Sequence, residues 1–288
     1  MELKKTALSH IHESLHAKMV SFAGYSMPVR YSSEVEEHKH VRSHAGVFDV
    51  SHMGEFMLRG PKALDLIQRV TSNDAAKLYD GKAQYSCLPN DKGGIIDDLL
   101  IYRLSEEEYL LVVNAANIQK DWLWIKSHNT EGVDMENISD SMSLLAVQGP
   151  KAGEILQPHT DINLSEMGFY TFQKGMFAGE SDIIVSATGY TGAGGFELYL
   201  PNEAAEKVWN TLFHNANETG LRPIGLAARD TLRLEMGFCL YGNDIDDTTS
   251  PIEGGLSWIT KFTKDFVNAE QLKEQREKGT ERKLTGFK

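Results

Sequence analysis

The sequence predicts an α+β fold built from two related units, each with an antiparallel sheet and flanking helices. Two observations support this fold class. The strand-like segments are joined by turns or hairpins rather than by regular strand–helix–strand crossovers, which favours antiparallel sheets with helices on one face. A series of segments also recurs along the chain in the same order and at nearly the same spacing, which indicates two units of similar fold.

The repeat starts from the sequence Gly-Pro-Lys-Ala, which occurs at Gly60 and again at Gly149. Each copy follows a strand-like segment and enters a helical pattern. Further strand-like segments lead to Asn114 in the first copy and to Asn202 in the second, and a helix that carries tryptophan follows each asparagine. Chance is the competing explanation, because Gly-Pro before a helix is common. The matching order and spacing favour duplication.

The individual elements follow from apolar periodicity and turn residues. An apolar run preceded by a glycine pair predicts a strand within Lys92–Tyr102, and shorter apolar runs predict further strands at Tyr109–Val113, Leu144–Val147 and Phe196–Leu200. Helical spacing predicts helices at Ala63–Val70, Ile118–Ser127, Glu206–His214, Gly225–Glu235 and Ala269–Lys278. The last residues, Glu281–Lys288, are expected to begin another strand.

Composition limits the classes of function. The 288 residues are enough for about two domains, and 41% hydrophobic content is that of a globular chain. A net charge of -12 argues against nucleic acid and against an anionic membrane surface as partners. Cys87 and Cys239 lie far apart and outside any CxxC pattern, which favours a reducing compartment without disulfides or structural zinc. We see neither an apolar run of membrane-spanning length nor a signal sequence, so we expect a cytoplasmic protein.

The most informative candidate residues are the adjacent carboxylates Asp97 and Asp98, inside the apolar run of Lys92–Tyr102. Strand alternation sends neighbouring side chains to opposite faces, so at least one of the two should point into an interior. A buried carboxylate is costly unless it is paired or hydrogen-bonded, and N–H groups of a ligand are one candidate partner. The competing interpretation is that both residues end the strand at a hydrated loop.

Two further candidates lie in the second half of the chain. Thr188–Glu197 is a glycine-rich loop between two strands, and its Glu197 could accept paired hydrogen bonds from an amidine-like edge such as that of a pterin. A flexible hairpin with a surface glutamate is the alternative. In the helix Gly225–Glu235, Arg229 could position a ligand carboxylate, whereas Asp230 and Arg233 are spaced for an ion pair within the helix.

The sequence His12-Glu13-Ser14-Leu15-His16 matches the HExxH pattern of zinc proteases. It lies in a polar stretch near the start of the chain, and no third ligand is evident. Chance therefore explains the match better than a metal site does, and we expect no metal.

Taken together, these segments resemble the T-protein of the glycine cleavage system, a tetrahydrofolate-dependent aminomethyltransferase family. The resemblance runs in family order across nearly the whole chain. Besides the tract Gly93–Leu99, it is carried by the stretches Lys18–Pro28, Phe48–Glu55, Val112–Ala115, Gly189–Gly192, Ala228–Glu235 and Tyr241–Ile245. The chain departs from the family in having Ala193-Gly194 where Glu-Asp is usual and His16 where glycine is common.

The resemblance implies a discontinuous first domain and a third, barrel-like β-domain that this chain lacks. The expected first α+β domain comprises residues 1–50 and 137–242, and the second comprises residues 51–136 and 243–278. Residues 279–288 would be the start of the missing C-terminal β-domain, which contributes a basic contact to the family's active site.

The resemblance also implies the reaction: transfer of the aminomethylene group from the lipoyl arm of H-protein to tetrahydrofolate. Asp98 matches the essential carboxylate, Glu197 would bind the pterin edge, and Arg229 would orient substrate or carboxylates. The residues expected to line the folate site are Met53, Tyr85, Leu100, Tyr102 and Tyr190. Two alternatives stay open: a folate-dependent demethylase of the same fold, and a non-catalytic folate-binding protein, although this chain lacks the Lys-Gly-Cys signature of the latter.

Overall fold

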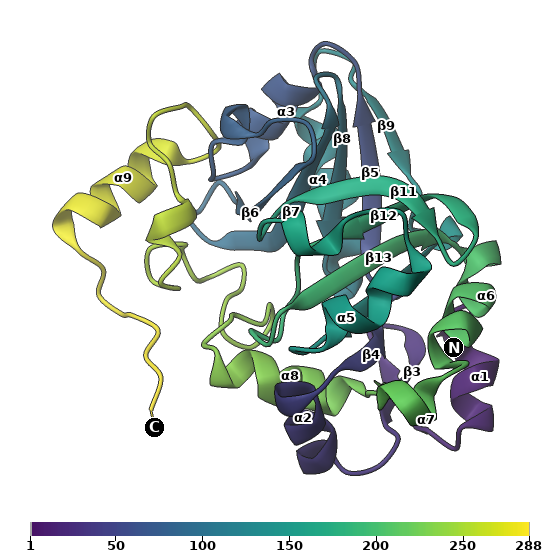
Figure 1. Cartoon of the computed structure of the whole chain (residues 1–288). Coiled ribbons are helices and arrows are strands. Elements are labelled where there is room, and N and C mark those ends of the chain that lie inside the picture. The colour runs from purple at the N-terminus through teal and green to yellow at the C-terminus, as the bar shows by residue number, and fades with distance from the viewer. Residues whose placement is uncertain (1, 288) are drawn as a thin grey trace. The chain divides into compact units, whose positions relative to one another are not determined.

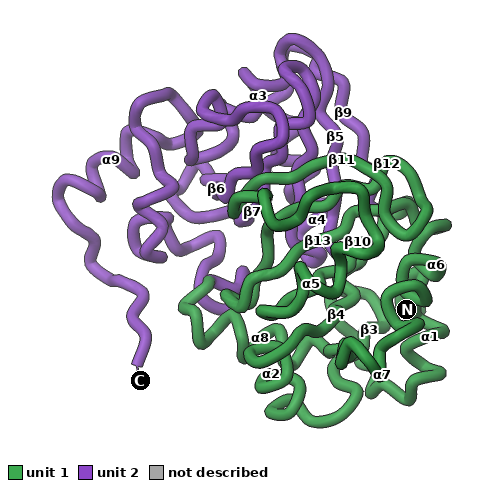
Figure 2. The backbone as a smooth tube through the Cα atoms, in the orientation of Figure 1, with its two compact units in different colours: residues 1–52, 140–238 green, residues 53–139, 239–288 purple. Residues whose placement is uncertain are grey.

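The computed structural model describes residues 2–287, and the chain divides into two compact units (Figure 2). Unit 1 comprises residues 1–52 and 140–238, and unit 2 comprises residues 53–139 and 239–288. Both units are discontinuous in sequence. The domain limits expected from the sequence, after residues 50, 136 and 242, stay predictions. Among residues 2–287 there is no helix with the length and apolar content that crossing a membrane requires.

Unit 2 is built on a five-stranded antiparallel sheet with the strand order β6-β7-β8-β5-β9. The strands are β5 (Gly54–Arg59), β6 (Lys82–Pro89), β7 (Ile95–Ser105), β8 (Glu108–Val113) and β9 (Asp134–Asn137). Two helices, α3 (Ala63–Val70) and α4 (Ile118–His128), pack on one face of this sheet (Figure 1). The helix α9 (Ala269–Lys278) follows later in the chain.

Unit 1 is built on a six-stranded sheet with the order β11-β12-β13-β10-β4-β14. Its strands are β4 (Gly46–Asp49), β10 (Met142–Gln148), β11 (Phe172–Phe177), β12 (Glu180–Ser186), β13 (Gly195–Pro201) and β14 (Arg222–Pro223). All neighbours are antiparallel except β14, which runs parallel to β4. Helices α5 (Ala152–Leu156) and α6 (Asn202–Phe213) pack on one face.

Unit 1 also contains a small sheet with the order β1-β3-β2. These strands are β1 (Lys4–Lys5), β2 (Lys18–Phe22) and β3 (Tyr25–Arg30). The remaining helices are α1 (Ser9–Ser14), α2 (Glu34–Ser43), α7 (Ala216–Thr219) and α8 (Leu226–Glu235), of which α8 contacts both α2 and β3.

The same arrangement of elements occurs in both units. The order β5-α3-β6-β7-β8-α4 in unit 2 matches β10-α5-β11-β12-β13-α6 in unit 1, and corresponding strands hold corresponding places in the two sheets. A further antiparallel neighbour completes the match, because β9 lies beside β5 as β4 lies beside β10. The α+β fold class with antiparallel sheets is therefore confirmed.

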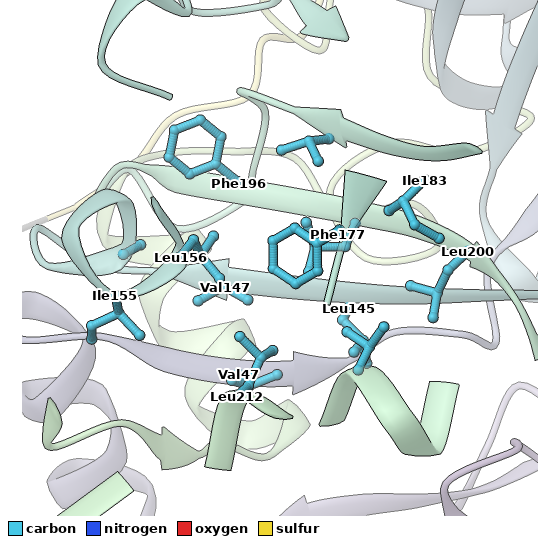
Figure 3. Close-up of a cluster of buried hydrophobic side chains, with 14 of the residues drawn as sticks. Val47, Leu145, Val147, Ile155, Leu156, Phe177, Ile183, Phe196, Leu200 and Leu212 are labelled. Atoms are coloured by element: carbon cyan, nitrogen blue, oxygen red, sulfur yellow. The ribbon is translucent and has the colours of Figure 1, made fainter. Parts of the chain in front are cut away.

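Each unit has its own apolar core between its sheet and its helices. In unit 1, Val47, Val147 and Phe196 of neighbouring strands meet Ile155 of α5 and Leu212 of α6 (Figure 3). In unit 2 the corresponding layer contains apolar residues of β5, β7 and β8 together with those of α3 and α4. The alternating strand pattern places these residues on one face of each sheet, so the residues between them point to the other face.

The predicted helices and strands occur where expected, with two exceptions. Helix α6 begins at Asn202 rather than at Glu206, because Ala204 and Ala205 are buried against the sheet and extend the helix by a turn. The strand expected at Glu281–Lys288 is not formed in residues 281–287. This segment is exposed, and one backbone hydrogen bond from Leu284 to Glu253 does not make a strand ladder. Lys288 lies outside the described residues.

Candidate active site

The glycine pair before β7 shapes the turn that sets up the acidic strand. Gly93 adopts a φ of +93°, which favours glycine, and a Cβ on Gly94 would lie 1.8 Å from the backbone oxygen of Asp247. The side chain of Asn90 accepts hydrogen bonds from the backbone N–H groups of Lys92 and Gly94. The turn is therefore fixed by its own hydrogen bonds, and β7, which carries Asp97 and Asp98, begins directly after it.

Asp97 and Asp98 point to opposite faces of the sheet, as the strand pattern predicted. Asp97 is opposite Leu88 of β6 and is fully buried on the face that carries α3 and α4. Asp98 is opposite Cys87, is half-buried and points to the other face. The alternative that both carboxylates end the strand at a hydrated loop is wrong, because β7 continues to Ser105.

The Asp97 carboxylate is held by N–H donors from the segment that links β8 to α4. The backbone N–H of Asn114 donates to Asp97 Oδ2 at 2.9 Å, and the side-chain amides of Asn114 and Asn117 donate to Oδ1 at 2.8 and 2.6 Å. Such donors stabilise the anion, although burial raises the pKa of Asp97 above its usual range. Asp97 is therefore a hydrogen-bonded structural carboxyl rather than an open binding group.

Asp98 has partners as well but remains accessible. Tyr85 Oη donates to Asp98 Oδ2 at 2.7 Å, and Asn114 Nδ2 donates to Oδ1 at 2.8 Å. Burial and the negative charge of Asp97 raise the pKa of Asp98 to about 7, and the two hydrogen bonds limit this rise. A carboxyl with a pKa near neutrality can accept and return a proton at physiological pH, which a usual aspartate does poorly.

The other predicted residues of unit 2 surround Asp98 on the same face of the sheet. Leu100 lies opposite Tyr85 on β6, and Tyr102 lies two residues further along β7 on the same face. Tyr85 and Leu100 are half-buried, whereas Tyr102 is fully buried. Met53 directly precedes β5 and is half-buried. Together they give Asp98 an apolar and aromatic surrounding.

The predicted residues of unit 1 form a second cluster. Glu197 of β13 is buried and accepts a hydrogen bond from the Thr188 hydroxyl. The guanidinium of Arg229 lies over the ring of Tyr190, at 4.5 Å from its centroid. Burial raises the pKa of Glu197 and lowers that of Arg229, while their opposite charges counteract both shifts. The predicted ion pair of α8 also forms, because Arg233 Nε donates to Asp230 Oδ1 at 2.8 Å.

The glycine-rich loop between β12 and β13 packs against the side chain of Gln148. Gln148 Nε2 donates to the backbone oxygen of Thr188, and Thr191 Oγ1 donates to Gln148 Oε1. A Cβ on Gly189 would lie 2.0 Å from that Oε1, and one on Gly195 would lie 2.2 Å from the backbone oxygen of Val147. The loop is thus closely packed, which contradicts the alternative of a flexible hairpin with an exposed Glu197.

The HExxH match has no metal-site geometry. Helix α1 ends at Ser14, and His16 lies beyond it with a φ of +57°. His12 Nε2 is 2.8 Å from Asp49 Oδ2, and its Nδ1 is 2.8 Å from the Tyr31 hydroxyl, so both ring nitrogens are in use. No group of three or more possible metal ligands occurs in residues 2–287.

Sequence reasoning missed the amides that hold the carboxylates. Asn114 marks the repeat in the sequence, but its contact with both Asp97 and Asp98 depends on how the chain turns after β8. Asn117 and Asp121 carry no signal beyond helical spacing. Asp121 is fully buried in α4. The sequence does not predict this burial, because α4 carries several other polar residues and an aspartate among them is expected to face solvent.

Comparison with known proteins places this geometry in a family. The family model of the GCVT N-terminal domain matches residues 8–264. The aminomethyltransferase of Flavobacterium psychrophilum is 65% identical over 285 residues, which cover 99% of this chain and 79% of that protein. The aminomethyltransferase of Halothermothrix orenii is 48% identical, with 99% and 80% covered. The chain therefore belongs to the GCVT family, and the predicted resemblance to the glycine cleavage T-protein is confirmed.

Solved structures agree with this assignment. The crystal structure of the glycine cleavage system aminomethyltransferase T from Bartonella henselae superposes with a TM-score of 0.89 at 36% identity, covering 96% of this chain and 76% of that one. A chain of the heterotetrameric sarcosine oxidase from Corynebacterium sp. U-96 gives a TM-score of 0.51 at 15% identity, covering 75% and 96%. The second match shows a shared fold alone.

Proposed function

We propose that this chain is a tetrahydrofolate-dependent aminomethyltransferase that accepts the aminomethyl group carried by the lipoyl arm of H-protein. Membership in the GCVT family supports this proposal. The observation that carries it is the half-buried Asp98, whose pKa of about 7 makes it a competent proton acceptor on an aromatic surface of unit 2.

The reaction replaces two bonds at one methylene carbon. Tetrahydrofolate N5 attacks the carbon of the S–CH2–N unit, the C–N bond breaks and ammonia leaves. N10 then attacks the same carbon, the C–S bond breaks and the ring of 5,10-methylenetetrahydrofolate closes. The two protons lost from N5 and N10 end on ammonia and on the dihydrolipoyl thiol, so the overall reaction is redox-neutral. The protein must therefore position N5 near the methylene carbon and transfer these protons.

We assign the transfer of these protons to Asp98. Its carboxylate would accept a hydrogen bond or a proton from the folate nitrogen that attacks, and it would stabilise the positive charge that develops there. Tyr85 and Asn114 hold the two oxygens of Asp98 in place before any ligand binds, so little reorganisation is needed. Met53 and Leu100, which are half-buried, would provide the apolar surface that a flat heterocycle requires, whereas Tyr102 is fully buried and has no exposed surface to offer a ligand.

Residues of unit 1 are assigned to binding. Glu197 keeps one hydrogen bond from Thr188 and is otherwise suited to accept paired N–H groups from the pterin edge. Arg229 is stacked on Tyr190, and no hydrogen bond joins it to Glu197 in the described residues, so its N–H groups can orient a carboxylate of the substrate. The lipoylated H-protein is the proposed partner and tetrahydrofolate the proposed co-substrate.

The test is to incubate the 288-residue chain with aminomethyl-loaded H-protein and tetrahydrofolate, and to measure 5,10-methylenetetrahydrofolate and ammonia. We expect both in equal amounts. Asp98→Asn should lower the rate by about a hundredfold to ten-thousandfold, the usual range for a proton-transfer group. Asp91→Asn, which removes an exposed carboxylate from the turn before β7, is the matched control and should leave the rate unchanged.

Three outcomes would contradict the proposal. An unchanged rate in Asp98→Asn would remove the role assigned to that carboxylate. Transfer of a methyl group to tetrahydrofolate from a methylated substrate, in place of aminomethyl transfer from H-protein, would favour the demethylase alternative. Tight binding of tetrahydrofolate without turnover of loaded H-protein would favour a non-catalytic folate-binding protein.

A further inference from the structure

A second buried carboxyl lies behind the acidic strand of unit 2. Asp121, in the first turn of α4, is fully buried and is within hydrogen-bonding reach of the Asp97 carboxyl. Apart from this carboxyl, neither oxygen of Asp121 has a hydrogen-bond partner in residues 2–287. An ionised carboxylate in such a place would have no N–H or O–H group to stabilise it.

Two carboxylates cannot both be ionised at hydrogen-bonding distance in a buried site, so the pair must hold one proton. The surroundings decide which carboxyl holds it. Asp97 accepts three N–H hydrogen bonds from Asn114 and Asn117, which stabilise its anion. Asp121 accepts none, so the proton resides on Asp121, which donates it to Asp97. This arrangement gives the acid proton of Asp121 an acceptor and gives the Asp97 carboxylate a fourth donor.

The other charged groups near the pair do not change this assignment. Lys120 favours an ionised Asp121, but its ammonium donates to the Tyr241 hydroxyl at 2.8 Å and lies 3.6 Å from Asp247. The charges of Asp97 and Asp98 act in the opposite direction. Burial and Asp97 raise the pKa of Asp121 to about 11, which agrees with the hydrogen-bond pattern.

The pair is connected to Asp98 through one amide group. Asn114 Nδ2 donates to Asp97 Oδ1 and to Asp98 Oδ1, each at 2.8 Å. The position of the Asp97 carboxylate therefore fixes the amide, and the amide fixes one oxygen of Asp98. Tyr85 holds the other oxygen, and Cys87 lies opposite Asp98 on the neighbouring strand.

We propose that Asp121 is a positioning residue for Asp98: by holding the single proton of the Asp97–Asp121 pair, it keeps Asp97 as a hydrogen-bonded anion that orients Asn114. The role of Asp98 in transfer rests on the proposed function, but the carboxyl pair does not. Asp121 touches no substrate. Its effect reaches the reacting carboxyl through Asp97 and Asn114.

The experiment follows the side-chain carboxyl carbons of aspartate by NMR while the pH of the ligand-free chain is changed. In the unaltered chain, we expect the Asp121 signal to keep its protonated position around neutral pH while Asp98 titrates. Asp121→Asn supplies an N–H donor in place of the acid proton and keeps the charge of the site. It should leave the midpoint of Asp98 unchanged. Asp97→Asn removes the neighbouring charge and should lower that midpoint by about one pH unit or more.

An Asp121 signal that is already ionised at neutral pH would overturn the proposal. So would a lower Asp98 midpoint in Asp121→Asn, because that shift would mean that a charge had been removed from position 121. Neither readout needs turnover, so failure of the proposed function would appear separately, as an absence of aminomethyl transfer in the unaltered chain.

Transfer rates then test the positioning role itself. Asp121→Leu removes the donor to Asp97 and should lower kcat by about tenfold or more, whereas Asp121→Asn should restore it to within about twofold. An Asp121→Leu variant that folds and transfers at the unaltered rate would contradict the positioning role. If this variant does not fold, the comparison of Asp121→Asn with the unaltered chain still decides, because a neutral acid and an amide must then behave alike across the pH range.

Discussion

If Asp121 is neutral in the folded chain, the free energy of unfolding should depend on pH in a way that can be measured without substrate. In the unfolded chain a carboxyl has its ordinary pKa of about 3.9, whereas burial raises the pKa of Asp121 in the folded chain to about 11. The folded state therefore binds one proton more than the unfolded state at every pH between these values. Because of this, the contribution of Asp121 to the free energy of unfolding falls as the pH rises.

The magnitude follows from the linkage. Each pH unit within that window costs the unaltered chain about 1.4 kcal/mol, or about 4 kcal/mol between pH 5 and pH 8. The side chain is fully buried, so solvent does not screen this cost. Asp121→Asn is free of it, although its second amide N–H stays unpaired at a cost of about 1–3 kcal/mol. The variant should thus be less stable than, or equal to, the unaltered chain at pH 5 and more stable at pH 8.

Urea unfolding at several pH values measures the difference directly, with the urea dependence checked for equality between the two chains. Asp91→Asn serves as the control, because this exposed carboxylate should give a difference that hardly varies with pH. A difference for Asp121→Asn that stays constant from pH 5 to pH 8 would refute the assignment of the proton to Asp121. A difference that falls with pH would show an ionised Asp121.

Four further predictions concern the candidate site. Tyr85→Phe removes a hydrogen bond to ionised Asp98 and should move the acid limb of the pH–rate profile up by about one unit, whereas a shift down would contradict the contact. Glu197→Gln should weaken tetrahydrofolate binding by about 1–3 kcal/mol by calorimetry, and normal affinity would exclude pterin pairing. Gly195→Ala, at a φ of +123° and against Val147, should lower the free energy of unfolding by about 2 kcal/mol or more, and unchanged unfolding would refute that close packing. Treatment with a chelator should leave transfer unchanged, and a loss would revive a metal role for His12.

Much of the fold can be predicted from local patterns. Apolar periodicity locates α3, α4, α8 and α9, and the repeated Gly-Pro-Lys-Ala sequence locates the two strand–helix junctions that begin each copy. Periodicity does not reveal which sheet a strand joins. β4 directly precedes β5 along the chain but pairs with β10, and β9 directly precedes β10 but pairs with β5. These pairings are between distant segments, so no local signal specifies them.

The same limit explains which parts of the site were visible in the sequence. Alternation along β7 separates Asp97 from Asp98, and that is a local property. Which of the two meets hydrogen-bond donors depends on Asn114, Asn117 and Asp121, which follow the next strand and reach back from α4. A family resemblance points to Asp98 alone. Only the folded chain adds that the neighbour of Asp98 is a carboxyl with three N–H donors and a second buried carboxyl beside it.

This geometry explains why the adjacent carboxyls Asp97 and Asp98 have different roles, one structural and one in proton transfer. A single carboxyl in a partly buried site tends either to be neutralised by burial or to be paired by donors until its pKa is low. Here the strand places a fixed anion, Asp97, next to Asp98 on the opposite face, where it raises the pKa of Asp98 without occupying its accessible side. The Asp97 carboxylate can in turn stay ionised in the interior because Asn114, Asn117 and the Asp121 proton stabilise it. A carboxyl with a pKa near neutrality on one face of the sheet therefore depends on a hydrogen-bonded, proton-sharing pair on the other. This is why we expect Asp97→Asn to lower the midpoint of Asp98 and Asp121→Asn to leave it unchanged, although neither residue shares the face of Asp98.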